Sequence, residues 1–328
     1  MKETSKTSLI TGIFGQDGSY LAELLLSKGY TVYGMERLDL SANSLKIKQY
    51  LHKNSIKPNE VTVNLENYDE LKTVLFKIRP DEIYHLAATH QSSQGRTVEN
   101  ILYNKNICAT SNILAAAMEG LKDAKILLAG SCLMFDNSRT QKQSEKTPFN
   151  SNSLYGLEKI AENKLAGYYR RKGLFVCNAI LYNHESSRRA DSFVTKKIVK
   201  NMVALKKGEI KNFSLGNLDT QKDWGYAKDY VQAMWLMMQA KTPEDYILST
   251  GALHSIADFA DICAQILKIK DWRSHVKLDK NIIARNFKAT TLTADCGKAR
   301  QKLGWKHSLD LKGLIKLMIS NEMNNELT

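Results

Sequence analysis

The chain has 328 residues, of which 43% are hydrophobic and 25% are charged, and these proportions are those of a globular protein rather than a disordered or fibrous one. Its formal net charge is +13 at pH 7, but the lysines and arginines are dispersed among acidic residues, so we expect no nucleic-acid partner. No apolar run reaches the roughly eighteen residues that span a bilayer, and Met1–Thr7 lacks the apolar stretch of a secretion signal, so we expect a cytoplasmic protein without a membrane partner.

Short apolar runs alternate with helical patterns in the first half of the chain. This alternation predicts an α/β fold, a doubly wound parallel sheet of the Rossmann type with helices on both faces. We expect six strands through about Tyr182, which complete a dinucleotide-binding domain over residues 1–182. The predicted strands are Ser8–Gly12, Thr31–Met35, Val61–Leu65, Glu82–Leu86 and Lys125–Gly130, and the predicted helices are Asp17–Lys28, Tyr68–Ile78 and Thr97–Glu119.

Beyond Asn183 the pattern is less regular and predicts a smaller, mainly substrate-binding lobe over residues 183–328, from which segments can return to the Rossmann domain. We expect this lobe to lie over the carboxyl edge of the sheet, where open α/β sheets bind their ligands. Its predicted helices are Ser192–Lys207, Ala227–Lys241, Ile256–Ile269 and Leu309–Ser320.

The five cysteines are widely spaced, and the chain contains neither a CxxC pair nor an HExxH motif. We therefore expect no disulfide framework and no metal site. The cysteines are Cys108, Cys132, Cys177, Cys263 and Cys296.

A glycine series follows the first predicted strand and leads directly into a helix. Glycines at these positions permit a tight turn and allow the backbone to approach a pyrophosphate, whose charge the free amides at the helix start stabilise. The position between strand and helix predicts a dinucleotide site. Its expected contacts are Gly12, Gly15, Gln16, Asp17 and Gly18.

The second predicted strand is followed by Glu36 and Arg37, at the place where a dinucleotide's adenosine ribose binds. A carboxylate there accepts hydrogen bonds from the ribose and repels a 2′-phosphate, whereas an arginine binds that phosphate. Glu36 favours NAD over NADP, and the sequence leaves both cofactors open. Asn64 and Leu65, at the end of the third predicted strand, are also expected cofactor contacts, as are Tyr155 and Lys159.

Tyr155 and Lys159 are four residues apart and therefore share one face of a helix. A nearby ammonium lowers the pKa of a phenol, which lets Tyr155 exchange the proton that accompanies hydride transfer at a carbinol carbon. Ser131, at the end of a predicted strand, is expected to hydrogen-bond the same sugar oxygen, although a strand-end hydroxyl can also cap the backbone. These three residues are the predicted catalytic group.

These motifs, together with longer runs, resemble those of the extended short-chain dehydrogenases/reductases and, among them, of the GDP-mannose 4,6-dehydratase family. The resemblance covers most of the chain and is most specific at Ile10–Glu23, Asn183–Arg189, Phe193–Ile198 and Gly216–Trp224. It implies an oxidoreductase with NADP as cofactor, a nucleotide-diphosphate sugar, GDP-linked, as substrate, and a homo-oligomer.

The resemblance also implies a set of polar and basic side chains that bind the nucleotide diphosphate through charge-assisted hydrogen bonds. Lys222 stands where the family usually has arginine, and Lys288 where it usually has an acid. An ammonium cannot reproduce the bidentate contact of an arginine, and the reversed charge at Lys288 affects recognition of the base. The expected contacts are Asn183, Arg188, Lys197, Lys222 and Arg285.

Leu133 occupies the place of the family's dehydration glutamate, and leucine has no proton to exchange. If the strand continues past Ser131, the neighbouring Cys132 points to the opposite face and is not a substitute. We therefore expect hydride transfer at C4 of the sugar without elimination, as in a 4-keto reductase or 4-dehydrogenase. Two alternatives remain: a 4,6-dehydratase that uses another acid such as His90, and a sugar-nucleotide-binding paralogue without turnover.

Overall fold

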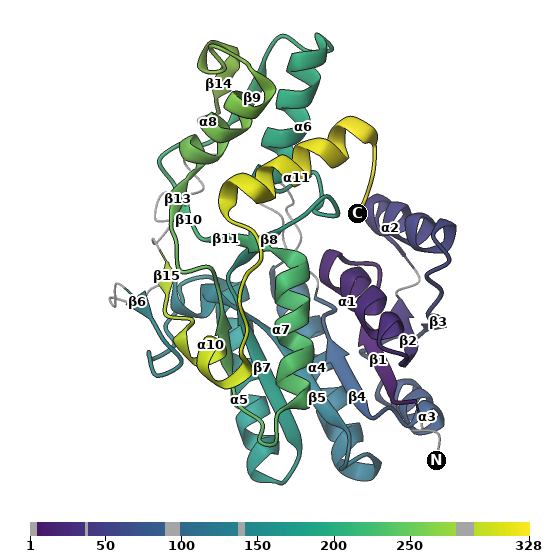
Figure 1. Ribbon diagram of the computed structural model, residues 1–328. Helices are drawn as coiled ribbons and strands as arrows, with labels where there is room; N and C mark the ends of the chain where they lie inside the picture. Colours follow the sequence, from purple (N-terminus) through teal and green to yellow (C-terminus); the bar gives the residue numbers. More distant parts are fainter. Residues whose placement is uncertain (1–4, 37–38, 89–98, 137–141, 280–291) are drawn as a thin grey trace.

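The computed structural model describes residues 5–36, 39–88, 99–136, 142–279 and 292–328, and inside the helix that begins at Glu99 it describes side chains from Lys105 onward. The chain forms a central parallel sheet covered by helices, with a smaller group of helices and short strands at one end (Figure 1).

The central sheet has seven parallel strands in the order β3-β2-β1-β4-β5-β7-β12. The chain order reverses between β1 and β4, the switch point at which doubly wound sheets bind ligands. This confirms the predicted fold class, although the seventh strand comes from far beyond Tyr182. The strands are β1 (Thr7–Thr11), β2 (Thr31–Glu36), β3 (Asn59–Thr62), β4 (Glu82–His85), β5 (Lys125–Ser131), β7 (Phe175–Leu181) and β12 (Tyr246–Leu248).

Helices cover both faces of the sheet, because successive strand residues point to opposite faces and both faces are apolar. Ile10 of β1 packs in the cluster of residues that includes Leu21 and Met234, whereas Leu9 packs on the other side with Leu114. One layer contains α1 (Gln16–Ser27), α2 (Ala42–Lys53) and α7 (Ala227–Gln239); the other contains α3 (Tyr68–Ile78), α4 (Glu99–Gly120) and α5 (Leu154–Arg171).

The smaller lobe has its own apolar core, in which Trp224, Phe259 and Ile315 are buried. In Figure 1 it stands at the end of the molecule opposite the N-terminus. Its helices are α6 (Val194–Lys207), α8 (Ile256–Leu267) and α11 (Leu311–Asn324), and its short strands are β9 (Phe213–Leu215), β10 (Gln221–Lys222), β13 (His254–Ser255) and β14 (Val276–Leu278), with the single turn η2 (Arg273–His275).

Short elements connect the lobe to the sheet. The strand β8 (Asn183–Glu185) pairs with β11 (Trp224–Tyr226), directly before α7 returns to the sheet. Residues 227–248 thus contribute a helix and a strand to the Rossmann part, as does the short helix α10 (Gly297–Leu303), which packs beside α7. The strands β6 (Lys142–Gln143) and β15 (Thr293–Ala294) form a further short parallel pair.

The bounds of most predicted elements lie within a few residues of the observed ones. The reason is that the spacing of apolar residues follows the face that each helix or strand buries. Helix α2 had not been predicted, although Ser41 caps its N-terminus by accepting a hydrogen bond from the amide of Ser44. Among the helices of the described ranges, none is both long and apolar enough to cross a bilayer.

Candidate active site

A cavity of about 710 Å³ opens between the carboxyl ends of the sheet strands and the smaller lobe, and we call it the main cavity. Its lining includes the turn after β1, the end of β5, the first turns of α5 and residues of α6. The position matches the one predicted from sequence. It also brings the glycine turn, Tyr155, Lys159 and Ser131 to one space.

The glycine turn at the start of α1 fits a dinucleotide pyrophosphate because no side chains at its glycines cover the backbone. Gly12 has φ +71°, and a Cβ there would lie 2.9 Å from Ala87 Cα. A Cβ on Gly18 would lie 2.3 Å from the carbonyl oxygen of Gly12. Gly15 caps α1 without a side-chain hydrogen bond, which leaves first-turn amides for an anion. Gly12, Gly15, Gln16, Asp17 and Gly18 all line the main cavity.

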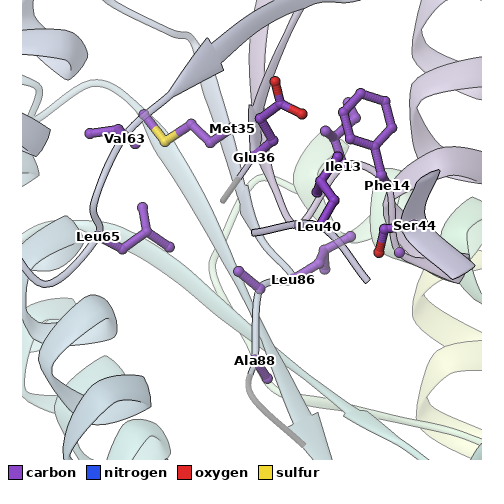
Figure 2. Close-up of a pocket in the computed structure, with 13 residues that line it drawn as sticks. Ile13, Phe14, Met35, Glu36, Leu40, Ser44, Val63, Leu65, Leu86 and Ala88 are labelled. Atoms are coloured by element: carbon purple, nitrogen blue, oxygen red, sulfur yellow. The ribbon is translucent and has the colours of Figure 1, made fainter. Parts of the chain in front are cut away.

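A second cavity of about 140 Å³ adjoins the glycine turn, between Gly15 and the ends of β2 and β3 (Figure 2). Glu36 and Leu65, both predicted cofactor contacts, line it together with Met35 and Leu86. Its apolar walls and single carboxylate suit an adenosine with its ribose hydroxyls. Asn64 is exposed instead and accepts a hydrogen bond from the amide of Glu66, so it serves the local turn.

Lys48 of α2 contacts Glu36 and was not among the site residues predicted from the sequence. Its ammonium donates to Glu36 Oε2 at 3.0 Å and pairs with Glu60 at 2.7 Å. The pairing partly neutralises the carboxylate that would meet the ribose. Arg37 lies outside the described residues, so its competition with Glu36 remains a prediction.

Gln16 and Asp17 are held by the strand β8. Gln16 donates to the carbonyl oxygen of His184 and accepts from the hydroxyl of Ser186. His184 Nε2 lies 2.8 Å from Asp17 Oδ2, and its ring stacks on Tyr230 with centroids 4.7 Å apart. Burial alone would lower the pKa of His184, but the Asp17 carboxylate outweighs it and raises that pKa.

Tyr155 and Lys159 lie one turn apart near the start of α5, which Ser153 caps by accepting from the amide of Gly156. The Lys159 ammonium lies 5.6 Å from the centroid of the Tyr155 ring. Ser131 Oγ accepts from the amide of Leu133, so it caps the following turn while its proton can still be donated to a ligand. All three predicted catalytic residues line the main cavity.

The pKa of Tyr155 is raised, so the expectation of a lowered value is wrong, although Lys159 by itself acts in the expected direction. Burial raises it most, Lys159 lowers it, and the carboxylates of Glu162 and Glu158 raise it again. The spacing of Tyr155 and Lys159 reveals only the effect of the lysine. Glu162 was detectable because it lies three residues after Lys159 and therefore on the same helical face.

The strand β5 ends at Ser131, and Cys132–Phe135 form the single helical turn η1. The expectation that Cys132 points away on a continuing strand is therefore wrong: Cys132 and Leu133 both line the main cavity. Burial raises the pKa of Cys132 to about 11, so its thiol is neutral at physiological pH. Leu133 contributes an apolar wall beside Ser131.

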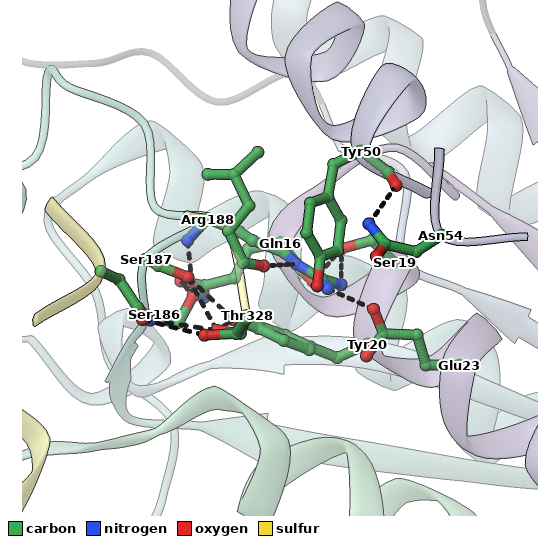
Figure 3. Close-up of polar contacts among 12 residues, drawn as sticks. Gln16, Ser19, Tyr20, Glu23, Tyr50, Asn54, Ser186, Ser187, Arg188 and Thr328 are labelled. Atoms are coloured by element: carbon green, nitrogen blue, oxygen red, sulfur yellow. Dashed lines mark hydrogen bonds and ion pairs between the residues drawn. The ribbon is translucent and has the colours of Figure 1, made fainter. Parts of the chain in front are cut away.

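Arg188 is among the residues that line the main cavity, but its side chain is fully buried and its guanidinium is bound within the fold (Figure 3). It pairs with Glu23, donates to Ser19 Oγ at 3.0 Å, and stacks 3.9 Å over the ring of Tyr20. These contacts join α1 to the segment after β8. A sequence cannot show which of two adjacent arginines is buried, and here it is the first.

Arg189, which the sequence analysis missed, lines the main cavity with a side chain 18% exposed. It lies 3.6 Å over the ring of Phe193 and 3.1 Å from Glu185. Asn183 and Lys222 also line the cavity as predicted, whereas Lys197 on α6 does not. Arg285, Lys288 and His90 lie outside the described residues. In the described ranges no cluster of His, Cys, Asp or Glu suits a metal ion.

A doubly wound sheet, a glycine turn after β1, and a Tyr-x-x-x-Lys pair facing the same cavity define the class of the extended short-chain dehydrogenases/reductases. Solved structures share this fold. The dTDP-glucose 4,6-dehydratase of Bacillus anthracis in complex with NAD has a TM-score of 0.84 at 17% identity, over 98% of each chain. RMD from Pseudomonas aeruginosa, complexed with NADPH, has a TM-score of 0.78 at 17% identity, over 98% of this chain and 100% of that one.

The sequence narrows this class. A profile of the family described as GDP-mannose 4,6 dehydratase matches residues 9–318. The GDP-mannose 4,6 dehydratase 2 of Arabidopsis thaliana is 38% identical over 334 residues, which cover 98% of this chain and 88% of that protein. The chain belongs to the GDP-mannose 4,6-dehydratase family, and the resemblance seen in the sequence is confirmed.

Proposed function

We propose that the protein is an NAD(P)-dependent oxidoreductase that acts at C4 of a GDP-linked sugar and does not eliminate water. The observation that carries this proposal is that Ser131, Tyr155 and Lys159 share the main cavity with Leu133. The first three suit proton transfer at a carbinol oxygen, and the fourth offers no acid or base.

The nicotinamide dinucleotide, when bound, supplies the hydride acceptor or donor. Gly12, Gly15 and Gly18 would hold its pyrophosphate, and Glu36 would accept from its ribose. Tyr155 then takes the proton of the C4 hydroxyl during oxidation or returns it during reduction. Lys159 supplies the positive charge that favours the phenolate, and Ser131 orients the sugar oxygen by donating its hydroxyl proton.

The absence of elimination is supported by the acids of the main cavity. After oxidation at C4, loss of water still needs a base for the C5 proton and an acid for the departing hydroxyl. Two described carboxylates line the cavity, and both are engaged: Asp17 with His184, and Glu185 with Arg189 and the hydroxyl of Thr195. Leu133, in the turn η1 that follows β5, adds only hydrocarbon.

Recognition of a nucleotide diphosphate is supported by the basic rim of the same cavity. Lys222 and Arg189 line it together with Asn183. Cationic donors of this kind bind phosphate oxygens through charge-assisted hydrogen bonds. The main cavity, at about 710 Å³, is of a size that accommodates a nucleotide or a drug-sized ligand.

The test incubates purified protein with NAD(H) or NADP(H) and a panel of nucleotide sugars and their 4-keto derivatives. Absorbance of the reduced nicotinamide should change with at least one GDP-linked member and remain constant with Tyr155→Phe. Mass spectrometry should detect no product lighter by one water. A dehydrated product from the wild-type protein would refute the loss of elimination.

A 4,6-dehydratase remains the second candidate, because the chain belongs to a family named for that reaction. It requires an acid other than the residue at position 133, and the same mass measurement decides between the two. A binding protein without turnover is less well supported, because all three members of the catalytic group are present and face the cavity.

A further inference from the structure

Two carboxylates surround the ammonium of Lys159 inside the protein. Lys159 Nζ lies 3.0 Å from Glu162 Oε2 and 3.8 Å from Glu158 Oε1. The three side chains are between 2% and 4% exposed, so water screens them little. Neither carboxylate belongs to the motif that identified Tyr155 and Lys159.

The elements packed against α5 add few charges to this cluster. Asn106 of α4 donates to Glu158 Oε1 at 2.8 Å. His85 of β4 is buried, and burial together with the nearby Lys159 lowers its pKa to about 3, so it is neutral. Cys132 of η1 is a neutral thiol whose pKa burial raises. From the described part of these elements, no second cation balances the two acids.

One buried ammonium therefore faces two buried carboxyl groups. If both carboxyl groups were ionised, one negative charge would have no partner, and burying an unpaired charge at low dielectric costs much free energy. Glu162 is the closer partner, and its Oε2 accepts a hydrogen bond from the Lys159 ammonium at 3.0 Å. Burial and the neighbouring Glu162 raise the pKa of Glu158 to about 7. Glu158 is thus the member of the cluster that changes charge near neutral pH.

We propose that Glu162 and Glu158 are positioning residues for the reaction at Tyr155: Glu162 holds the Lys159 ammonium in place, and proton binding by Glu158 sets the charge around the Tyr155–Lys159 pair. This inference rests on the proposed function for its effect on turnover, but the proton binding itself does not. When Glu158 is ionised, its charge disfavours the phenolate of Tyr155. When Glu158 takes a proton from solvent, that penalty disappears.

The first measurement is NMR of protein labelled at the glutamate carboxyl carbons, without cofactor or substrate. Subtracting the spectrum of Glu158→Gln identifies the Glu158 signal, which should titrate near pH 7, as expected from its raised pKa of about 7. In Glu162→Gln the same signal should titrate lower by about one unit or more, because a neighbouring negative charge is gone. A titration near the ordinary value for glutamate, or one unaffected by Glu162→Gln, would overturn the proposal.

The second measurement is the pH profile of sugar oxidation. Below the titration of Glu158, the wild-type protein and Glu158→Gln should turn over alike. Above it, at about pH 8, Glu158→Gln should oxidise the sugar roughly threefold to tenfold faster, because the phenolate forms more readily. KM should be unchanged. Profiles that coincide at all pH values, or differ equally at all of them, would overturn the proposed role at Tyr155.

Glu82→Gln is the matched control, since Glu82 is also a buried carboxylate paired with a lysine, Lys6 at 3.1 Å, but lies outside both cavities. It should leave the pH profile and the Glu158 titration unchanged. If no sugar is turned over by any variant, the proposed function fails while the NMR titration still decides whether the carboxyl cluster binds its proton.

Discussion

Lys48 donates to both carboxylate oxygens of Glu36, at 3.2 and 3.0 Å. Glu36 ends strand β2 and borders the cavity that suits adenosine. Lys48 comes from α2, which lies with α1 and α7 in the helical layer on one face of the sheet. The place proposed for the cofactor ribose therefore holds a carboxylate paired with an ammonium rather than a lone acid. A 2′-phosphate would meet both charges there.

We expect the wild-type protein to bind NAD(H) more tightly than NADP(H), because Glu36 repels a 2′-phosphate. Glu36→Ala should narrow that gap, and Lys48→Ala should widen it by removing the compensating charge. Fluorescence titration with each reduced cofactor measures the ratio. Reduced nicotinamide mononucleotide, which lacks adenosine, should bind equally to all three proteins. A wild-type preference for NADP(H) would show that Lys48 or Arg37 dominates the site.

Tyr155→Phe should lower turnover by roughly 10²-fold or more, since it removes a positioned acid and base. Cofactor affinity should stay close to wild type because the ring remains and only the hydroxyl is lost. Single-turnover kinetics and cofactor titration on the same preparation separate the two effects. Unchanged turnover would contradict the assigned role of Tyr155.

Leu133→Glu places a carboxyl group in the main cavity beside Ser131. We expect a small yield of product lighter by one water, where the wild-type protein gives none, because the variant supplies the missing acid and base. The apolar surroundings should raise the pKa of the new carboxyl and limit the yield. Mass spectrometry of the sugar nucleotide measures it, and Leu133→Gln, which has the same shape without the proton chemistry, is the control.

The two adjacent arginines should respond differently to removal. Arg188→Ala should destabilise the protein by about 3–5 kcal/mol, because it breaks a buried charge pair and leaves Glu23 without its partner. Arg189→Ala should instead raise KM for the nucleotide sugar about tenfold or more, and it should cost less stability than Arg188→Ala because Glu185 keeps its hydrogen bond from the hydroxyl of Thr195. Denaturant unfolding and steady-state kinetics on both variants test this. Equal loss of stability in both would contradict the assignment.

The ion pair of His184 with Asp17 should make stability depend on pH. The folded pKa of His184 is raised, so its contribution is complete below the ordinary value of 6.5 and is lost as pH rises through the raised value. The folded pKa of Asp17 is lowered, although burial opposes this, so its contribution is complete above 3.8 and is lost as pH falls through the lowered value. The melting-temperature advantage of wild type over Asp17→Asn should therefore shrink above about pH 6.5.

The sequence by itself determined the features that depend on local spacing. The glycines at 12, 15 and 18 predict a tight turn because only a residue without Cβ fits there, and the structure places their missing Cβ atoms against Ala87 and the Gly12 carbonyl. Tyr155 and Lys159 share a helical face because four residues make about one turn. Alternating apolar runs predicted the parallel sheet, since both of its faces are buried.

Only the tertiary structure decided which polar side chains are buried and what they contact. Arg188 and Arg189 are neighbours in sequence and both line the main cavity, yet the side chain of Arg188 is fully buried against α1 while that of Arg189 is partly exposed. From the sequence alone, Glu162 and Glu158 are expected to be surface acids of a helix. In the structure, the packing of α4 against α5 encloses them with Lys159. Burial and charge pairing arise from contacts between segments far apart in the chain, so spacing along the sequence cannot specify them.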